Sequence, residues 1–213
     1  MRALLQALPP RLRHLLFGWG SVGVAYSLGG LLQRPATLLT ESALDRLLPF
    51  DPAGVWCYLS FFLLVPLGYL ACPAARLPWL TRAMQCCALA SGLAFIAWPT
   101  TLAYPALPAA GGWSTTLLQW LAAADTAQNC LPSLHGALTV LAAWALLQWR
   151  ERPLRSLLVV LWAAAIAYSI VQARRHLSID LGAGVVLGLA AGRLCRPAAT
   201  HASLCPLPET TAP

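Results

Sequence analysis

The sequence predicts an all-α integral membrane protein, a six-helix bundle with both termini in the cytoplasm. Of its 213 residues, 59% are hydrophobic and 10% are charged, whereas about 25% of the residues in soluble domains are charged. The hydrophobic residues form long runs that are almost free of charge, as membrane-spanning helices do. The net charge is +7 and every basic residue apart from histidine is arginine. These arginines are scattered over the ends of the apolar runs, so nucleic-acid binding is not expected.

Six apolar runs predict the spans, and the loops between them predict the orientation. The runs cover residues 14–32, 53–72, 83–98, 134–149, 156–173 and 178–194. More arginines lie in the loops on the side of the two termini than in the opposite loops, which predicts cytoplasmic termini. We expect residues 1–196 to form one membrane domain. The polar, proline-rich residues 197–213 then form a disordered tail.

Two loops contain apolar residues of their own. Leucines at helical spacing in residues 33–52 predict a short helix at the membrane interface. Within the long loop of residues 99–132, residues 113–124 are apolar but too few to span, so we expect them to lie in the interface or to dip into the protein. Trp56 and Tyr58 are expected at one interface of the second span.

A short polar stretch precedes the sixth run. His176 and Asp180 are four residues apart, so on a helix they share one face. A carboxylate there can accept a hydrogen bond from one imidazole nitrogen and raise the basicity of the other. Arg174 and Arg175 supply the charge that binds a phosphate. The alternative is an arginine pair at a membrane surface with a capping histidine.

A second histidine opens the fourth run. His135 follows Pro132 and Ser133, which suit the start of a helix. Helix N-termini bind anions, and a histidine there can protonate a leaving oxygen. The alternative is an interfacial histidine with a capping proline. For the remaining histidines, His14 and His201, a structural role is favoured.

Two further residues leave alternatives open. Ser169 lies seven residues before His176, so its hydroxyl can reach a phosphate or can bond back into its own helix. Cys130 lies just before the segment that ends at His135, and the sequence neither supports nor excludes a disulfide there. The cysteines include no Cys-x-x-Cys pair, so a zinc site is not expected.

Two of these segments together resemble a known family. The run Pro132-Ser133-Leu134-His135 and the pattern Ser169-x6-His176-x3-Asp180 resemble the second and third motifs of the type 2 phosphatidic acid phosphatase superfamily. They are more similar to its branch of inositol phosphorylceramide synthase-like and sphingomyelin synthase-like proteins. The resemblance implies six helices around a site at the membrane surface.

The resemblance also implies a role for each motif residue. His176 attacks phosphorus and becomes a phosphohistidine, Asp180 orients His176, and His135 protonates the departing oxygen. Ser133, the Leu134 N–H and Arg175 surround the phosphoryl oxygens. No metal or other cofactor is expected, because histidine, arginine and helix-end dipoles stabilise the charge.

The chain departs from the family pattern at two positive charges. The family's first motif contains a lysine and an arginine, whereas residues 98–105 contain no lysine and Tyr104 stands at the arginine position. The arginine usually found six residues before the third-motif histidine is Ile170. Arg174 and Arg175 are the candidate substitutes.

The function expected from these observations is phosphate chemistry on a lipid. We expect hydrolysis of a lipid phosphate monoester or diphosphate in the bilayer, at the extracytoplasmic face of a bacterial inner membrane. One alternative is transfer of a phospho-head group to an acceptor alcohol. Another is a non-catalytic lipid-binding or transport protein of the same fold. An intramembrane protease is disfavoured, because neither Ser21 nor Ser133 lies in a suitable Gly-x-Ser setting.

Overall fold

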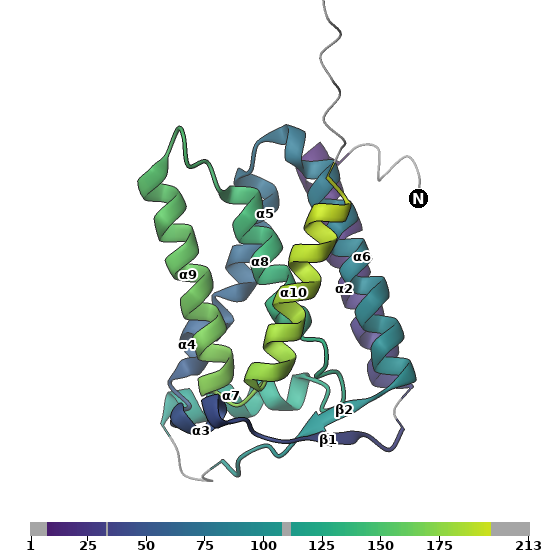
Figure 1. Ribbon diagram of the computed structural model, residues 1–213, viewed down its shortest axis with the longest axis vertical. Helices are drawn as coiled ribbons and strands as arrows, with labels where there is room; N and C mark the ends of the chain where they lie inside the picture. The colour runs from purple at the N-terminus through teal and green to yellow at the C-terminus, as the bar shows by residue number, and fades with distance from the viewer. Residues whose placement is uncertain (1–7, 33, 108–111, 197–213) are drawn as a thin grey trace, which may run out of the picture.

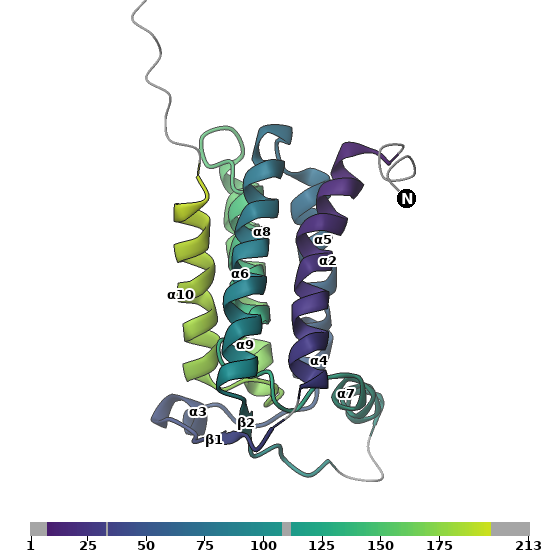
Figure 2. The ribbon, with the colours of Figure 1, turned by 90° about the vertical axis from the view of Figure 1, so that its right-hand side faces the viewer.

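The computed structural model describes residues 8–32, 34–107 and 112–196, which are mostly helical. The predicted tail and His201 lie outside these residues. The elements in chain order are α2 (Pro10–Leu31), β1 (Thr37–Leu39), α3 (Ala43–Leu47), α4 (Gly54–Leu59), α5 (Phe61–Ala71), η1 (Ala74–Arg76), α6 (Leu77–Ala97), β2 (Thr100–Leu102), α7 (Trp113–Ala124), α8 (Leu134–Leu146), α9 (Pro153–Gln172) and α10 (Ser178–Leu194). The long helices lie side by side, and α3, α7 and the two strands gather at one end (Figure 1). Helix α2 begins, and α10 ends, at the opposite end (Figure 2).

Among the described residues, three helical stretches are long and apolar enough to cross a membrane. They are Gly54–Ala71, Ala74–Ala97 and Pro153–Gln172. Large apolar side chains such as Leu63 and Leu161 are exposed on them, as lipid-facing positions would be. This composition suggests a membrane protein. Helices α2, α8 and α10 are not among these candidates, and α8 ends at Leu146 where the sequence predicted a run to residue 149.

The predicted second span, residues 53–72, agrees with the candidate span Gly54–Ala71, but it consists of two helices, α4 and α5, that meet at Ser60. There the Ser60 hydroxyl donates to the Cys57 carbonyl oxygen (2.6 Å) and accepts from Trp162 Nε1 (2.8 Å). Helix α6 begins at Leu77, within the predicted loop of residues 73–82, so that boundary was wrong. Pro78 suits this first turn because proline lacks a backbone N–H, which would have no acceptor within the helix there.

The helices pack on an apolar core and on one very close crossing. Leu64, Leu80, Met84 and Leu141 are fully buried in that core. The close crossing joins α8 to α10: a Cβ added at Gly184 would lie only 2.0 Å from the Ser133 carbonyl oxygen. Only glycine therefore allows the first turn of α8 to approach α10 this closely, as in other membrane helix pairs with small residues at the contact.

The end with the strands is tied together by backbone pairing. Strands β1 and β2 are parallel, with Thr37 opposite Thr100, and the Thr100 hydroxyl accepts from the Leu131 N–H (2.9 Å). The strands were not predicted. The short helix expected in residues 33–52 is present as α3, and α7 has the predicted bounds of residues 113–124. This end thus connects the loops before α4 and α8.

Gly184→Ala is expected to weaken the crossing, because its new Cβ would overlap the Ser133 carbonyl. Overpacking of this kind costs about 1–3 kcal/mol, so the midpoint of thermal unfolding in detergent should fall. Gly182→Ala on the same helix is the matched control, since no atom of the described part of the chain outside that helix turn lies within 4 Å of the added Cβ. An unchanged midpoint for Gly184→Ala would show that the crossing has room to spare.

Candidate active site

The His176–Asp180 pair lies at the start of α10. Asp180 Oδ2 lies 2.6 Å from His176 Nδ1, and both side chains are buried. A carboxylate can only accept here, so Nδ1 holds a hydrogen and the lone pair of His176 is on Nε2. This confirms the contact that the four-residue spacing predicted and leaves Nε2 as the nitrogen able to react.

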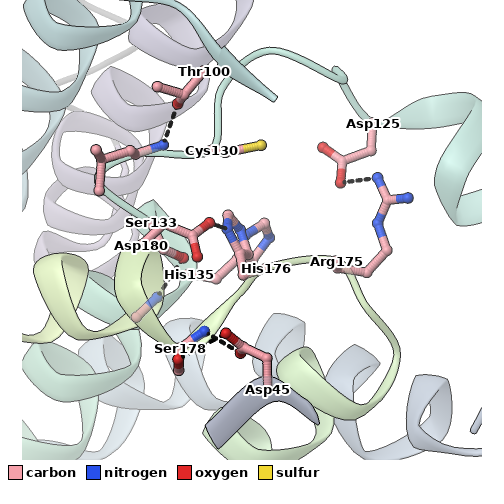
Figure 3. Close-up of polar contacts among 12 residues, drawn as sticks. Asp45, Thr100, Asp125, Cys130, Ser133, His135, Arg175, His176, Ser178 and Asp180 are labelled. Atoms are coloured by element: carbon pink, nitrogen blue, oxygen red, sulfur yellow. Dashed lines mark hydrogen bonds and ion pairs between the residues drawn. The ribbon is translucent and has the colours of Figure 1, made fainter. Parts of the chain in front are cut away.

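The second histidine meets the first directly. His135 lies in the first turn of α8, and its Nδ1 is 3.1 Å from His176 Nε2 (Figure 3). Tyr58 from α4 hydrogen bonds to His135 Nε2 at 2.8 Å, and Phe61 packs edge-on against the same ring. With Nδ1 of His176 protonated, each group donates to the next: Tyr58 to His135, His135 to His176, and His176 to Asp180. Tyr58 can also accept, so it suits the imidazolium form of His135 as well.

The starts of α8 and α10 are bonded to each other. Ser133 donates its N–H to the Asp180 carbonyl oxygen (3.0 Å), and its hydroxyl caps α8 by accepting from the Gly136 N–H (3.2 Å). Leu134 is the first residue of α8, and such a residue has no hydrogen-bond acceptor within its own helix for its N–H. Of the predicted phosphate contacts on this segment, the Leu134 N–H thus has no acceptor within α8, and the Ser133 hydroxyl, which accepts from Gly136, still has its own hydrogen to donate.

Arg175 lies near the two rings (Figure 3) and keeps an unused donor. Its Nη2 is 2.8 Å from Asp125 Oδ2, and its guanidinium stacks over the Tyr104 ring at 4.8 Å. The side chain is 7% exposed, and its Nε–H has no partner among the residues that the structure describes. Burial disfavours the charged form, but Asp125 outweighs this and raises the pKa of Arg175. A buried cation with a free donor is suited to an anion.

The other two predicted phosphate ligands are engaged elsewhere. Arg174 donates to the carbonyl oxygens of Asp45 and Leu48, both at 2.8 Å, and pairs with Glu41 at 3.2 Å. Its backbone has a φ of 50°, which turns successive side chains in different directions. Ser169 donates to the Ile166 carbonyl oxygen at 2.8 Å, as the alternative for that serine anticipated. The structure does not bring either side chain to the histidine pair.

Asp45 is a buried carboxylate that the sequence analysis missed. It accepts from the Ser178 N–H (2.7 Å) and hydroxyl (3.0 Å), at the first residue of α10, and from the Ser42 N–H (2.8 Å). Burial alone would raise the pKa of Asp45, but these hydrogen bonds outweigh it and lower the pKa below its usual value. Asp45 thus caps, from another segment, the helix that holds Asp180. The Ser42–Asp45 spacing within a capping box was the one available signal.

Tyr58 and Asp125 were missed for a different reason. Tyr58 is 1% exposed and hydrogen bonds to His135, so it packs inside the bundle, whereas Trp56 is exposed. Asp125 accepts from the Tyr26 hydroxyl, the Thr126 N–H and Arg175. All these partners are distant or adjacent in sequence without any helical spacing, so no local pattern could have indicated them. Cys130 is a buried free thiol beside Tyr104.

Two cavities reach the site from different sides. One of about 240 Å³ lies among α2, α4, α5, α7 and α8 and is lined by Tyr58, His135 and Asp125 among mainly apolar side chains. Another of about 250 Å³ is lined by Tyr104, Arg174, Arg175 and apolar residues of α7 and the neighbouring loops. The Arg175–Asp125 ion pair joins a residue of each lining, so it lies between the two cavities.

Comparison of the chain with protein-family models, with curated proteins and with solved structures finds no match. The resemblance described above therefore rests on the motif residues, and the chemistry has to be argued from the site.

Asp45→Asn is expected to lower the stability of the fold by about 1–3 kcal/mol, because Asn keeps one acceptor oxygen where the carboxylate offers two. The lowered pKa gives the sign of the pH dependence. The contribution of the carboxylate is present above its unfolded pKa of about 4 and is lost as pH falls through the lower folded value. Thermal unfolding in detergent between pH 7 and pH 3 measures both effects. Equal midpoints for the variant and the native protein at pH 7 would contradict this role.

Proposed function

We propose that this chain is an integral-membrane lipid phosphate phosphatase or phosphotransferase that acts through a phosphohistidine. The observation that supports it is the series of contacts from Asp180 through His176 to His135. A carboxylate, a nucleophile and a general acid in hydrogen-bond contact are what covalent phosphoryl transfer needs. A structural ion pair alone would not need His135 and Tyr58 as well.

In the first step, the lone pair of His176 Nε2 attacks phosphorus and the bond from phosphorus to the leaving oxygen breaks. Asp180 stabilises the positive charge that develops on the ring. His135, in its imidazolium form, gives its Nδ1 proton to the leaving oxygen, while Tyr58 accepts from Nε2–H. In the second step, His135 takes a proton from water or from an alcohol, which attacks the phosphohistidine and frees His176.

The phosphate must lie between the rings, so their direct contact is a resting arrangement. The free Nε–H of Arg175 and the first N–H groups of α8 are the donors suited to its oxygens. No step here requires a metal ion, because these groups and the imidazolium carry the charge stabilisation.

The apolar surroundings support a lipid as the substrate. The cavity beside His135 is mainly apolar and lies between helices, so it can hold part of an acyl or prenyl chain. We propose that all six predicted runs span the membrane, with both termini cytoplasmic and the histidine pair at the extracytoplasmic face, as in a bacterial inner membrane. Helices α8 and α10 are short, and both begin at the end of the bundle where α3, α7 and the two strands lie. We propose that these elements extend the protein to the extracytoplasmic face.

Hydrolysis and transfer share the first step and differ in what attacks second. The cavity lined by Tyr104 and Arg175 offers an acceptor alcohol a second route to the site, which favours transfer as the second candidate. A non-catalytic lipid-binding or transport protein would need neither the Nδ1–Oδ2 bond of 2.6 Å nor the contact between the rings.

Detergent-purified protein is expected to release phosphate from phosphatidic acid, phosphatidylglycerol phosphate or a polyprenyl diphosphate without added divalent metal. His176→Ala should abolish this activity because the nucleophile is lost, and His135→Ala should reduce it by a factor of about 10²–10⁴. His14→Ala is the control, since His14 bonds to Thr81 in another part of the bundle.

Acid-labile phosphate bound to the native protein and missing from His176→Ala would identify the covalent intermediate. Activity that survives His176→Ala would eliminate the assigned nucleophile. No turnover of any lipid phosphate, with or without an acceptor alcohol, would favour the lipid-binding or transport alternative.

A topology reporter fused after Pro105 is expected to read extracytoplasmic, because that residue lines the cavity beside Arg175. A reporter fused after Arg150, in the loop between α8 and α9, should read cytoplasmic and serves as the matched control. The opposite pair of readings would invert the proposed orientation, and two equal readings would overturn the count of spans.

A further inference from the structure

The charged side chains around the histidine pair sum to a negative charge, which by itself disfavours the binding of an anion. Among residues 8–32, 34–107 and 112–196, the charged side chains near the rings are one guanidinium, Arg175, and two carboxylates, Asp125 and Asp180. The next layer adds Arg174, which is paired with Glu41, and the buried carboxylate of Asp45. With neutral imidazoles the site is thus negative before any phosphate arrives.

Asp125 is held firmly in this position. Its Oδ1 accepts from the Tyr26 hydroxyl and the Thr126 N–H, and its Oδ2 accepts from Arg175. Burial would raise the pKa of Asp125, but His135, Tyr26 and Arg175 together lower it. The carboxylate therefore stays ionised at neutral pH. When a phosphate takes up the free Nε–H of Arg175, Asp125 keeps its three donors, the Tyr26 hydroxyl, the Thr126 N–H and Arg175 Nη2, and remains beside the ligand.

We propose that Asp125 is a specificity-determining residue that makes this site select phosphate groups with one negative charge over those with two. This inference rests on the proposed function and narrows its substrate class to lipid phosphodiesters or singly protonated phosphates. Arg175 is shared between Asp125 and the ligand, so the ligand gains less than a full unit of opposing charge. A second negative charge on the ligand adds repulsion from Asp125 without adding a cation.

The selectivity follows from the place of Asp125 as well as from its charge. The residue lines the cavity that contains His135, and its partner Arg175 lines the other cavity. A phosphate held between the rings and touching Arg175 must therefore lie near this carboxylate. In a buried site water screens charges weakly. One additional unit charge on a phosphate near Asp125 therefore changes the affinity for that phosphate by about tenfold or more.

The experiment compares two small probes on the full-length protein in detergent. Dimethyl phosphate always has one negative charge, while methyl phosphate has two above its second pKa of about 6. Dissociation constants are measured by ³¹P NMR titration at pH 8 and pH 5. At pH 8 the native protein should bind dimethyl phosphate about tenfold more tightly than methyl phosphate. Between pH 8 and pH 5, the affinity for methyl phosphate should rise by a similar factor, and the affinity for dimethyl phosphate should rise less.

Dimethyl phosphate corrects for protein groups that titrate over the same range. The titratable or charged groups that surround Asp125 and the rings are Tyr26, Tyr58, Tyr104, Cys130, His135, Arg175, His176 and Asp180. Protonation of any of these groups changes the affinity for both probes, whereas protonation of methyl phosphate changes the affinity for methyl phosphate alone.

The variants separate charge from structure. Asp125→Asn should increase the affinity for methyl phosphate at pH 8 by about tenfold and should change the affinity for dimethyl phosphate less. Tyr26→Phe removes one hydrogen bond from Asp125 but leaves its charge, so it should keep the native preference. If Asp125→Asn does not fold, the pH comparison on the native protein still decides.

Equal affinity of the native protein for the two probes at pH 8, or a ratio unchanged in Asp125→Asn, would overturn the inference while leaving phosphate chemistry in place. Binding of neither probe to the native protein or to Asp125→Asn would instead overturn the proposed function, and the inference with it.

Discussion

The close crossing of α8 and α10 is the contact on which the rest of the site depends. Gly184 brings the backbone of α10 against the Ser133 carbonyl oxygen, and the Ser133 N–H bonds to the Asp180 carbonyl oxygen. Each helix begins beside a histidine. The crossing therefore fixes the separation of the two rings through backbone atoms, which are less mobile than the side chains they support.

The surrounding loops turn this pair into an enclosed site. Asp45, from α3, caps α10, and Thr100, from β2, holds the segment that leads into α8. The parallel strands join these two loops. Three stretches far apart in sequence thus depend on one another, and the apolar bundle beneath supplies the burial that strengthens each hydrogen bond.

How much of this the sequence could predict depended on the range of each interaction. The contact of His176 with Asp180 follows from helical spacing, and the bounds of α7 and α10 follow from apolar runs. The break at Ser60 and the burial of Tyr58 have no local signal, because both arise from packing against distant helices.

The charges show the same limit. Arg174 and Arg175 are adjacent and look equivalent in the sequence, yet the left-handed backbone at Arg174 sends them to different partners. The sequence could count the arginines but could not assign them, because that depended on where Glu41 and Asp125 came to lie.

The contact between the two imidazoles has a meaning for the molecule at rest. An uncovered imidazole lone pair attracts transition-metal ions and stray electrophiles. In this protein the N–H of His135 covers the lone pair of His176, while Asp180 occupies the other side of the ring. In the mechanism we propose, this contact keeps Nε2 of His176 covered until a phosphate oxygen replaces it as the acceptor for His135 Nδ1–H.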